Sequence, residues 1–403
     1  MKDDIEQKKI AAPYELPAGW KWTRLGDVVN IYNGDRGENY PNKKDYVSSG
    51  IPFINAGCLE NGNINYNLAN CITEEKYNSL RAGKILKEDI LYCLRGSLGK
   101  LGIVREERYG AISSSLCIFR STENIVPDFL LNVLKSNIIF QQQKKIENGT
   151  AQPNLSAKEV AKYIIPLPPT LAEQQRIVSR IESLFTKLEE AKDKAQSVVD
   201  GFELRRAAVL HKAFTGELTA KWRKEHGVKD ESWKEKRFDE FCLLKRGFDL
   251  PATQRIEGKF PLVSSSGIID SHNEPKVKAP CVVTGRSGSI GKVFYITEDC
   301  FPLNTTLYSE KLFANDAKYV YLYLQTFDFK KYSSSTAVPT LNRNNFADVP
   351  VKVPTLPEQQ EIVRILDSVL EKEADAKEIA EYVLEQIGLL KKSILARAFR
   401  GEL

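Results

Sequence analysis

The sequence predicts an α+β protein in which an antiparallel two-helix coiled coil joins and separates two similar globular domains with pseudo-twofold symmetry. Three observations predict this fold: a long stretch that occurs twice, a heptad pattern inside each copy, and a repeated order of short strands. Residues 169–218 recur about 185 positions later as residues 354–403, and about 21 of the 50 positions match without a gap. A period this long indicates a duplicated domain-plus-helix unit and excludes a solenoid.

The two copies share both of their ends. Each opens with Thr-Leu-x-Glu-Gln-Gln-x-Ile-Val, from Thr170 or Thr355, and closes with Ala-Phe-x-Gly-Glu-Leu. Prolines stand just before each opening, where a helix tolerates them because its first amides have no intrahelical partner. Gly216 and Gly401 mark the predicted helix ends.

Apolar residues inside each copy recur at spacings of three and four, which is typical of a coiled coil. A helix of about 44 residues carries the chain roughly 65 Å, so the second helix pairs with the first only by running back. Pairing between two molecules is the other possibility, although the tether favours pairing within the chain. Glu373 is the one polar seam residue, which either fixes the register or reaches solvent. The predicted seam consists of Ile177, Ile181, Leu184, Leu188, Val198, Phe202, Ile362, Leu366, Val369, Val383, Ile387 and Ile394.

Outside the helices, short β-like runs alternate with glycine and asparagine, and one helix-like run follows them in each half. The first half has runs at 20–32, 51–54, 89–93, 101–105 and 115–119 before a helix at 129–137. The second has runs at 233–244, 260–263, 281–284, 292–296 and 305–308 before a helix at 319–327. The predicted organisation is a first domain at 1–165, a helix at 166–218, a second domain at 219–352 and a second helix at 353–403.

The composition is that of an ordinary folded protein, with 42% hydrophobic and 28% charged residues among 403. No segment approaches 18 consecutive apolar residues and the start carries alternating charges, so the expected location is the cytoplasm and no membrane partner is expected. Seven cysteines without a Cys-x-x-Cys pair and three scattered histidines predict neither a metal site nor a disulfide framework. The net charge of +5 only weakly favours nucleic-acid binding.

Each domain contains a glycine-rich turn between two apolar runs, Arg95-Gly-Ser-Leu-Gly-Lys100 and Arg286-Ser-Gly-Ser-Ile-Gly-Lys292. A nucleotide P-loop is excluded because the first glycine and the final Ser or Thr of that motif are missing. Two interpretations stay open: a plain hairpin turn, or a loop that holds a phosphate backbone and offers arginine to base edges.

Other polar segments pair between the domains: 33–37 with 245–247, 55–57 with 264–267, and 113–115 with 304–306. They suit solvent-facing turns as well as base contacts. No catalytic residue is predicted, because methyltransferase motifs such as Asn-Pro-Pro-Tyr/Phe and a glycine-rich S-adenosylmethionine loop are missing. The predicted DNA-contacting residues are Arg36, Asn55, Arg95, Ser97, Lys100, Ser114, Arg246, Ser265, Arg286, Ser289, Lys292 and Asn304.

Together these motifs resemble the specificity subunits of Type I restriction-modification enzymes over nearly the whole chain. The resemblance rests on the glycine turns, on the run Gly-Thr-Ala-Gln-Pro-Asn-Leu155 with its echo Ser-Thr-Ala-Val-Pro-Thr-Leu341, and on the Pro-Leu-Pro-Pro-x-x-x-Glu-Gln-Gln helix start. The second helix start departs from the pattern, since it lacks the double proline.

The resemblance implies that each globular domain reads one half of a bipartite, asymmetric site in double-stranded DNA. It also implies that the helices set the distance between the halves and dock two modification subunits, with motor-nuclease restriction subunits as further partners. This chain would bind no cofactor, while its partners would use S-adenosylmethionine, ATP and Mg. The alternative function is a coiled-coil scaffold with two protein-interaction domains and no role in DNA binding.

Overall fold

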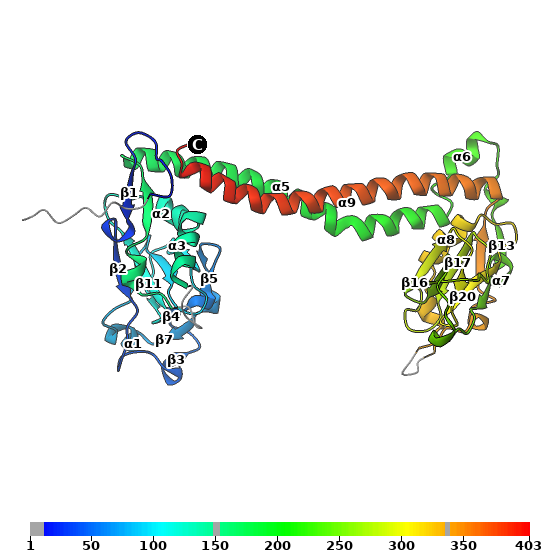
Figure 1. Cartoon of the computed structure of the whole chain (residues 1–403), viewed down its shortest axis with the longest axis horizontal. Coiled ribbons are helices and arrows are strands. Elements are labelled where there is room, and N and C mark those ends of the chain that lie inside the picture. Colours follow the sequence, from blue (N-terminus) through cyan, green and yellow to red (C-terminus); the bar gives the residue numbers. More distant parts are fainter. Residues whose placement is uncertain (1–11, 148–153, 335–338) are drawn as a thin grey trace, which may run out of the picture. The chain divides into compact units, whose positions relative to one another are not determined.

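The computed structural model describes residues 12–147, 154–334 and 339–403, which form two compact units (Figure 1). The first unit consists of Met1–Lys194 and Val383–Leu403, and the second of Ala195–Tyr382. The helices α5 (Leu171–Phe214) and α9 (Leu356–Ala398) each contribute one end to each unit. Each unit therefore combines segments from both sequence repeats.

The same four-stranded antiparallel sheet lies at the centre of both units. Its order is β2-β11-β8-β9 in the first unit and β14-β20-β17-β18 in the second. Every one of these strands overlaps a predicted β-run, although several extend beyond it, and the middle strands are buried except at the ends of β11 and β20. Their bounds are β2 Val29–Asn33, β8 Ile90–Cys93, β9 Leu101–Ile103, β11 Leu116–Ser121, β14 Leu243–Arg246, β17 Cys281–Gly285, β18 Val293–Ile296 and β20 Thr306–Lys311.

A two-stranded sheet next to each long helix also repeats, as β1-β12 and β13-β21. The predicted single runs at 20–32 and 233–244 are wrong in one respect, because a short helical turn splits each into two strands. A helix follows the central sheet in both units, as predicted. The bounds are β1 Lys21–Arg24, β12 Ile164–Leu167, α2 Pro127–Leu134, α7 Phe238–Phe241, β13 Lys234–Arg237, β21 Pro350–Val353 and α8 Ala317–Thr326.

The peripheral elements differ between the units, and most of them were not predicted. The first unit has the sheet β10-β4-β7-β3, and the second has β16-β15-β19. The first-unit elements are β3 Tyr46–Val47, β4 Ile51–Ile54, β5 Leu59–Glu60, β6 Asn63–Ile64, β7 Asn70–Ile72, α1 Glu74–Ser79, β10 Ala111–Ile112, α3 Asn137–Glu147 and α4 Ala157–Val160. The second-unit elements are α6 Ala220–Glu225, β15 Phe260–Ser264, β16 Gly267–His272 and β19 Phe301–Pro302.

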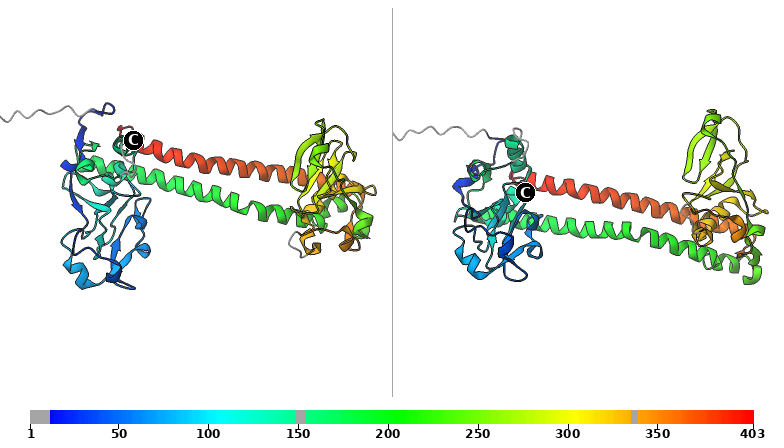
Figure 2. Two further views of the ribbon diagram at one scale, coloured as in Figure 1. Left: turned by 60° about the horizontal axis from the view of Figure 1, so that its bottom comes forward. Right: turned by 90° about the horizontal axis from the view of Figure 1, so that it is seen from below.

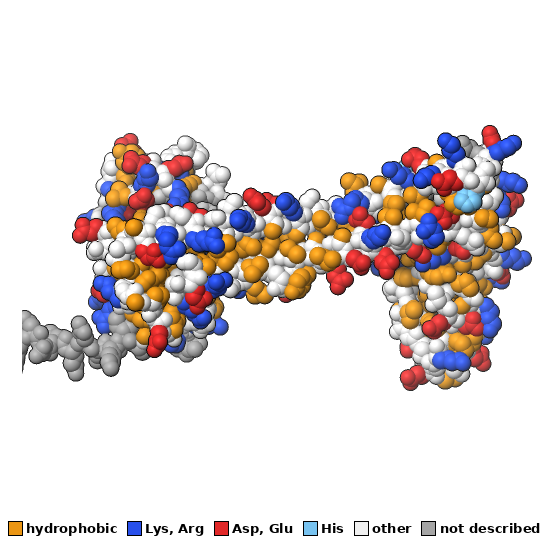
Figure 3. All heavy atoms as spheres, turned by 90° about the horizontal axis from the view of Figure 1, so that it is seen from above, with side chains coloured by type: hydrophobic (Ala, Val, Ile, Leu, Met, Phe, Trp, Pro, Cys, Tyr) orange, Lys and Arg blue, Asp and Glu red, His pale blue; other side chains and the backbone are white. Residues whose placement is uncertain are grey.

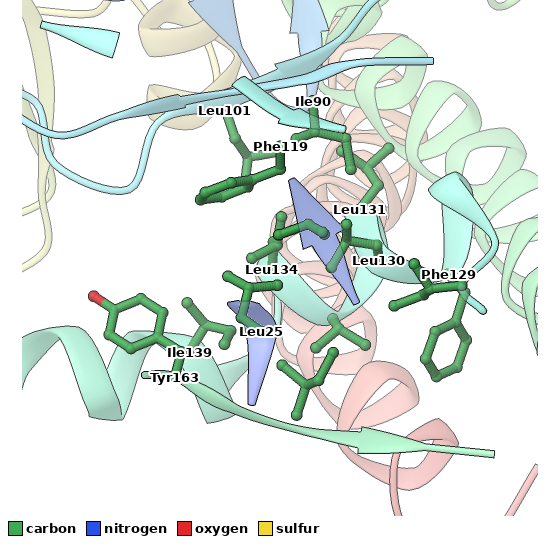
Figure 4. Packing of buried hydrophobic residues seen from close by; sticks show 14 of the residues in the cluster. Leu25, Ile90, Leu101, Phe119, Phe129, Leu130, Leu131, Leu134, Ile139 and Tyr163 are labelled. Atoms are coloured by element: carbon green, nitrogen blue, oxygen red, sulfur yellow. The ribbon is translucent and has the colours of Figure 1, made fainter. Parts of the chain in front are cut away.

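The core of the first unit lies between its central sheet and the helices. Side chains from the helical turn between β1 and β2 and from β8, β9, β11, α2 and α3 point toward one another, including Phe119, Leu130 and Ile139 (Figure 4). The same cluster contains Ile177 and Ile181 from the start of α5. The sheet and the beginning of the long helix are therefore packed as one body.

The end of the opposite long helix completes each core. Ala398 and Phe399, at the end of α9, are fully buried in the first unit, where Phe399 packs edge-on against Phe129 at 5.6 Å. In the second unit Phe214, at the end of α5, packs edge-on against Tyr319 at 5.5 Å. Gly216 and Gly401 follow with positive φ, the conformation expected just after a helix. These contacts explain why the Ala-Phe-x-Gly-Glu-Leu ending occurs twice.

The Glu-Gln-Gln motif ties the start of each long helix to the loop before α2 or α8. Gln174 accepts a hydrogen bond from the Val126 amide at 2.8 Å, and Gln359 accepts one from the Asp316 amide at 2.8 Å. Both glutamine side chains are almost fully buried. The repeated motif therefore has an anchoring role that the heptad pattern does not require.

The two long helices lie side by side (Figure 2) and contact each other within both units. Lys391 pairs with Glu189 in the first unit, and Arg205 with Glu373 at 2.7 Å in the second. The predicted seam charge Glu373 thus meets a cation on α5. Of the predicted seam residues, Ile177, Ile181, Ile362, Leu366 and Ile387 are buried and the others are half-buried.

The glutamate of the motif has different surroundings in the two units. Glu173 is partly exposed and pairs with Arg176 on the next helical turn at 2.8 Å. Glu358 is fully buried and pairs with Arg223 of α6 at 2.6 Å, while the Thr219 hydroxyl donates to the same carboxylate at 2.6 Å. The segment after Gly216 therefore covers the start of α9.

We expect Arg223→Ala to lower the free energy of unfolding of the second unit by roughly 3–5 kcal/mol, because it leaves a buried carboxylate without its cation. Denaturant unfolding measures this change. The matched control is Arg176→Ala, which removes the partner of the equivalent exposed glutamate and should cost at most about 1 kcal/mol. Equal effects of the two substitutions would contradict the difference in burial.

Candidate nucleic-acid interface

Each unit has a polar cleft at one end of its central sheet, beside the glycine-rich turn. The cleft in the first unit has a volume of about 290 Å³, and the cleft in the second about 790 Å³. Both are formed by the end of β2 or β14, the residue that begins the turn, and the segment containing Leu155 or Leu341. They are lined by Asn33, Arg36, Leu94, Arg95, Asn154, Leu155, Ser156, Ala157, Lys158 and Glu159, and by Lys245, Arg246, Gly247, Arg286, Leu307, Ser334, Thr340, Leu341, Asn342, Arg343 and Asn345.

Backbone hydrogen bonds establish which residues are equivalent in the two clefts. The Leu94 carbonyl accepts from Leu155 at 2.9 Å, and the Arg286 carbonyl accepts from Leu341 at 2.8 Å. The amides of Leu94 and Arg286 donate to Ser115 and Thr305 respectively, both at 2.8 Å. Arg286 is therefore the structural counterpart of Leu94.

This register identifies the equivalent residues of the two glycine-rich turns. Arg95 corresponds to Ser287, since both form an isolated β-bridge with the residue before the shared leucine. In this register the positive-φ glycines and the final lysines of the two turns are equivalent, so that Gly96 and Lys100 match Gly288 and Lys292. The predicted pairing of 113–115 with 304–306 shifts by one residue. Ser115 corresponds to Thr305, so that Ser114 matches Asn304.

Two further glycines lie at equivalent places just after β2 and β14, at the strand ends beside the clefts. A Cβ on Gly34 would overlap the carbonyl oxygens of Ile112 and Ser113, and one on Gly247 would overlap those of Pro302 and Leu303. The strand end must therefore lie directly against the neighbouring backbone. These glycines are equivalent, so Asn33 corresponds to Arg246 and Arg36 to Asp249 within the predicted pairing of 33–37 with 245–247.

The cleft of the second unit contains four cations and no lining carboxylate. Lys245 pairs with Glu310 at 2.7 Å, and this contact raises the pKa of the lysine. Arg246 pairs with Asp249 at 3.0 Å. Arg343 donates to the Leu244 carbonyl at 2.9 Å, whereas Arg286 makes only a long contact of 3.4 Å with the Asn304 carbonyl.

The cleft of the first unit is smaller and carries its charges at other positions. The Arg95 Nε donates to the Asn154 side chain at 3.0 Å, so the turn is tied to the segment opposite. Asp35, which is buried, accepts from the amides of Arg36 and Arg81 at 2.7 Å and shapes the loop after β2. Glu159 is held in a capping box with Ser156, and the hydrogen bond from the Ser156 amide lowers its pKa.

The structure brings only part of the predicted contact set into the clefts. Arg36 and Arg95 line the first, Arg246 and Arg286 line the second, and Asn304 adjoins the second. Lys292 lines a different cleft of about 790 Å³, against the second half of α5. Asn55 caps a short helical turn, and the amide of Ser265 donates to the Thr305 hydroxyl behind the glycine turn. No lining role is found for Ser97, Lys100, Ser114 or Ser289 in the two clefts.

Lys158, Asp249 and Arg343 were missed by the sequence analysis, while Lys245 was placed in the polar segment 245–247 but not among the predicted DNA-contacting residues. Arg343 follows the echoed Leu341, so the repeated Pro-x-Leu segment was the signal that located it. Residues 149–153 and 335–338, the remainder of those echoed runs, lie outside the described residues. Within the described ranges, no group of three or more His, Cys, Asp or Glu side chains is placed to hold a metal ion.

Both clefts therefore offer hydrogen-bond donors and positive charge to a ligand rich in acceptors, such as a base edge or a phosphate. The family model for the Type I restriction modification DNA specificity domain matches this chain twice, at residues 17–196 and 230–382. The chain belongs to the family of Type I restriction-modification DNA specificity proteins. The alternative of a scaffold without a DNA role is not favoured by this match.

Curated relatives agree with this family. The chain is 24% identical over 442 residues to the StySPI specificity subunit of Salmonella potsdam, covering 96% of this chain and 90% of the relative. It is 23% identical over 437 residues to the EcoKI specificity subunit of Escherichia coli, with the same coverage. The match to the EcoBI specificity subunit is 29% identical over 229 residues, 56% of this chain, and spans about half (48%) of that relative.

Solved structures show the same fold. The HsdS subunit from Thermoanaerobacter tengcongensis superposes with a TM-score of 0.72 at 22% identity, covering 97% of this chain and 99% of the other. A chain from a structure of a type I R-M system gives a TM-score of 0.71 at 21% identity, covering 97% of this chain and all (100%) of that chain. In the described parts of the chain, no helix is long and apolar enough to cross a membrane.

We expect Gly247→Ala to destabilise the second unit by roughly 1–3 kcal/mol, because the added Cβ overlaps backbone oxygens. Thermal unfolding measures the change. Gly388→Ala is the control: its Cβ in α9 would meet no atom within 4 Å, so alanine should stabilise the helix by about 0.5–1 kcal/mol. If Gly247→Ala were as stable as Gly388→Ala, this result would contradict the close approach of Gly247 to the backbone of Pro302 and Leu303.

Proposed function

We propose that each unit reads one half of a bipartite, asymmetric site in double-stranded DNA through its cleft. The observation that carries this proposal is the placement of the cations. The clefts occupy the same position in the fold, yet the cations of one cleft have no cationic counterpart in the other. Asn33, Leu94 and Ala157 of the first unit stand where the second has Arg246, Arg286 and Arg343.

Shared scaffolds with different recognition groups suit a target whose halves differ. If both clefts only neutralised phosphates, any arrangement of cations would serve, because phosphate contacts position a protein without reading sequence. Base edges instead require a donor or acceptor at a fixed place. Binding should still weaken as salt rises, since Lys245 and the arginines displace counterions from the duplex.

We further propose that α5 and α9 set the distance between the half-sites and dock two modification subunits. The helices carry exposed apolar side chains, among them Leu204, Ile379, Tyr382, Leu389 and Leu390. Figure 3 shows apolar side chains gathered along one face of the long helices. A group of exposed apolar side chains favours a protein partner, because contact between apolar surface and water is unfavourable.

In this proposal the chain is not itself catalytic. Modification subunits would supply the S-adenosylmethionine chemistry on adenine, and restriction subunits the ATP- and Mg-dependent translocation and cleavage. This chain would bind no cofactor and would work in the cytoplasm, where the DNA is.

Inserting seven residues into both long helices, after Lys194 and after Tyr382, tests the spacing role. Seven helical residues add about 10 Å, which corresponds to about three base pairs. We expect the spacer between the half-sites to lengthen by about three base pairs, with both half-sites unchanged, in the methylation pattern of the complex with its modification subunit.

The control carries the insertion in α5 alone, which shifts the heptads of one helix past the other and should reduce stability. A doubly extended protein that keeps the original spacer would show that the helices do not set it. If the complex without any insertion showed no sequence preference, this result would contradict the DNA-reading role itself.

A further inference from the structure

Arg286 occupies the position that an apolar side chain, Leu94, fills in the first unit. Its counterpart Leu94 is 2% exposed and belongs to the core of the first unit. Arg286 is half-buried and instead faces the cleft of the second unit. Replacing a core leucine with arginine at the head of a constrained turn costs packing, so the guanidinium needs a compensating role.

The turn holds the Arg286 backbone rigidly. Its amide donates to the Thr305 carbonyl at 2.8 Å, and its carbonyl accepts from the Leu341 amide at 2.8 Å. Gly288 and Gly291 follow with φ near +80°. A backbone held on both sides positions the side chain for directional hydrogen bonds rather than for general charge neutralisation.

The other cations of this cleft are already engaged. Lys245 and Arg246 are paired with the carboxylates of Glu310 and Asp249, and Arg343 is bound to a backbone carbonyl. Among the described residues, the Arg286 side chain contacts no carboxylate, and the one hydrogen bond of its guanidinium is the 3.4 Å contact with the Asn304 carbonyl. The guanidinium therefore keeps most of its donors for a ligand.

We propose that Arg286 reads a guanine in the half-site of the second unit, a readout that the first unit lacks because Leu94 stands there. This inference rests on the proposed function. A guanidinium matches the O6 and N7 acceptors of guanine in the major groove with two parallel hydrogen bonds. A phosphate is the other ligand with suitable acceptors, and the test separates the two.

The experiment selects bound sequences from a randomised duplex library, using the complex of this chain with its modification subunit. The wild-type chain should select two half-sites, one containing an invariant guanine. Arg286→Lys retains the positive charge but loses the planar guanidinium that can donate two parallel hydrogen bonds. Arg286→Leu introduces the residue type that Leu94 provides at the equivalent position of the first unit. Both should relax the preference for that guanine by roughly tenfold or more while the other half-site stays unchanged.

A chemical probe on the DNA makes the result independent of folding. Replacing the selected guanine with 7-deazaguanine removes the N7 acceptor, which should weaken wild-type binding several-fold and leave Arg286→Leu binding unchanged. Lys278→Ala, a loss of one exposed cation of the same unit outside the cleft, is the control and should keep the wild-type preference.

Two outcomes would overturn the inference while leaving the proposed function intact. Arg286→Leu could weaken binding to all sequences equally with Arg286→Lys restoring it, which identifies a phosphate contact. Alternatively, both variants could keep the guanine preference. If the wild-type complex selects no bipartite sequence, the proposed function fails, and with it this inference.

Discussion

The rest of the structure depends on one kind of contact: each long helix begins in one unit and buries its end in the core of the other. Ala398 and Phe399 complete the core around Phe129, and Ala213 and Phe214 pack into the core around Tyr319. Neither globular part closes its core from its own repeat alone. The first unit is complete only once the chain has returned along α9, whereas the second contains the end of α5 and the start of α9.

This requirement explains which parts of the repeat stay alike. The helix ends are held by packing and by glycines after the last turn, and the helix starts by Gln174 and Gln359, whose amides join two segments. Such residues have few substitutes, because a buried hydrogen-bonding side chain needs both partners. Between the ends the constraint relaxes: Arg205 pairs with Glu373, whereas the matching positions of the other unit hold Leu188 and Leu390.

The recognition surface follows the opposite rule. Backbone features repeat closely there, from the close approach at Gly34 and Gly247 to the bridges with Asn154 and Thr340. The side chains on that backbone do not repeat. A fixed scaffold with exchangeable side chains lets each unit present a different set of donors, which is the property that an asymmetric DNA site demands.

The sequence alone determined the duplication, the two long helices and the strands of both central sheets, because heptads, helix ends and apolar runs are local patterns that chain connectivity carries directly. It also located Arg95, Arg286 and the echoed segments near the site. Only the tertiary structure decided the one-residue shift between the segments 113–115 and 304–306, the inclusion of Arg343, and the separation of Lys292 from Arg286. The physical reason is that backbone hydrogen bonds between distant segments set the register. A comparison of sequence motifs contains only side-chain identities, and these do not report which backbone groups are bonded.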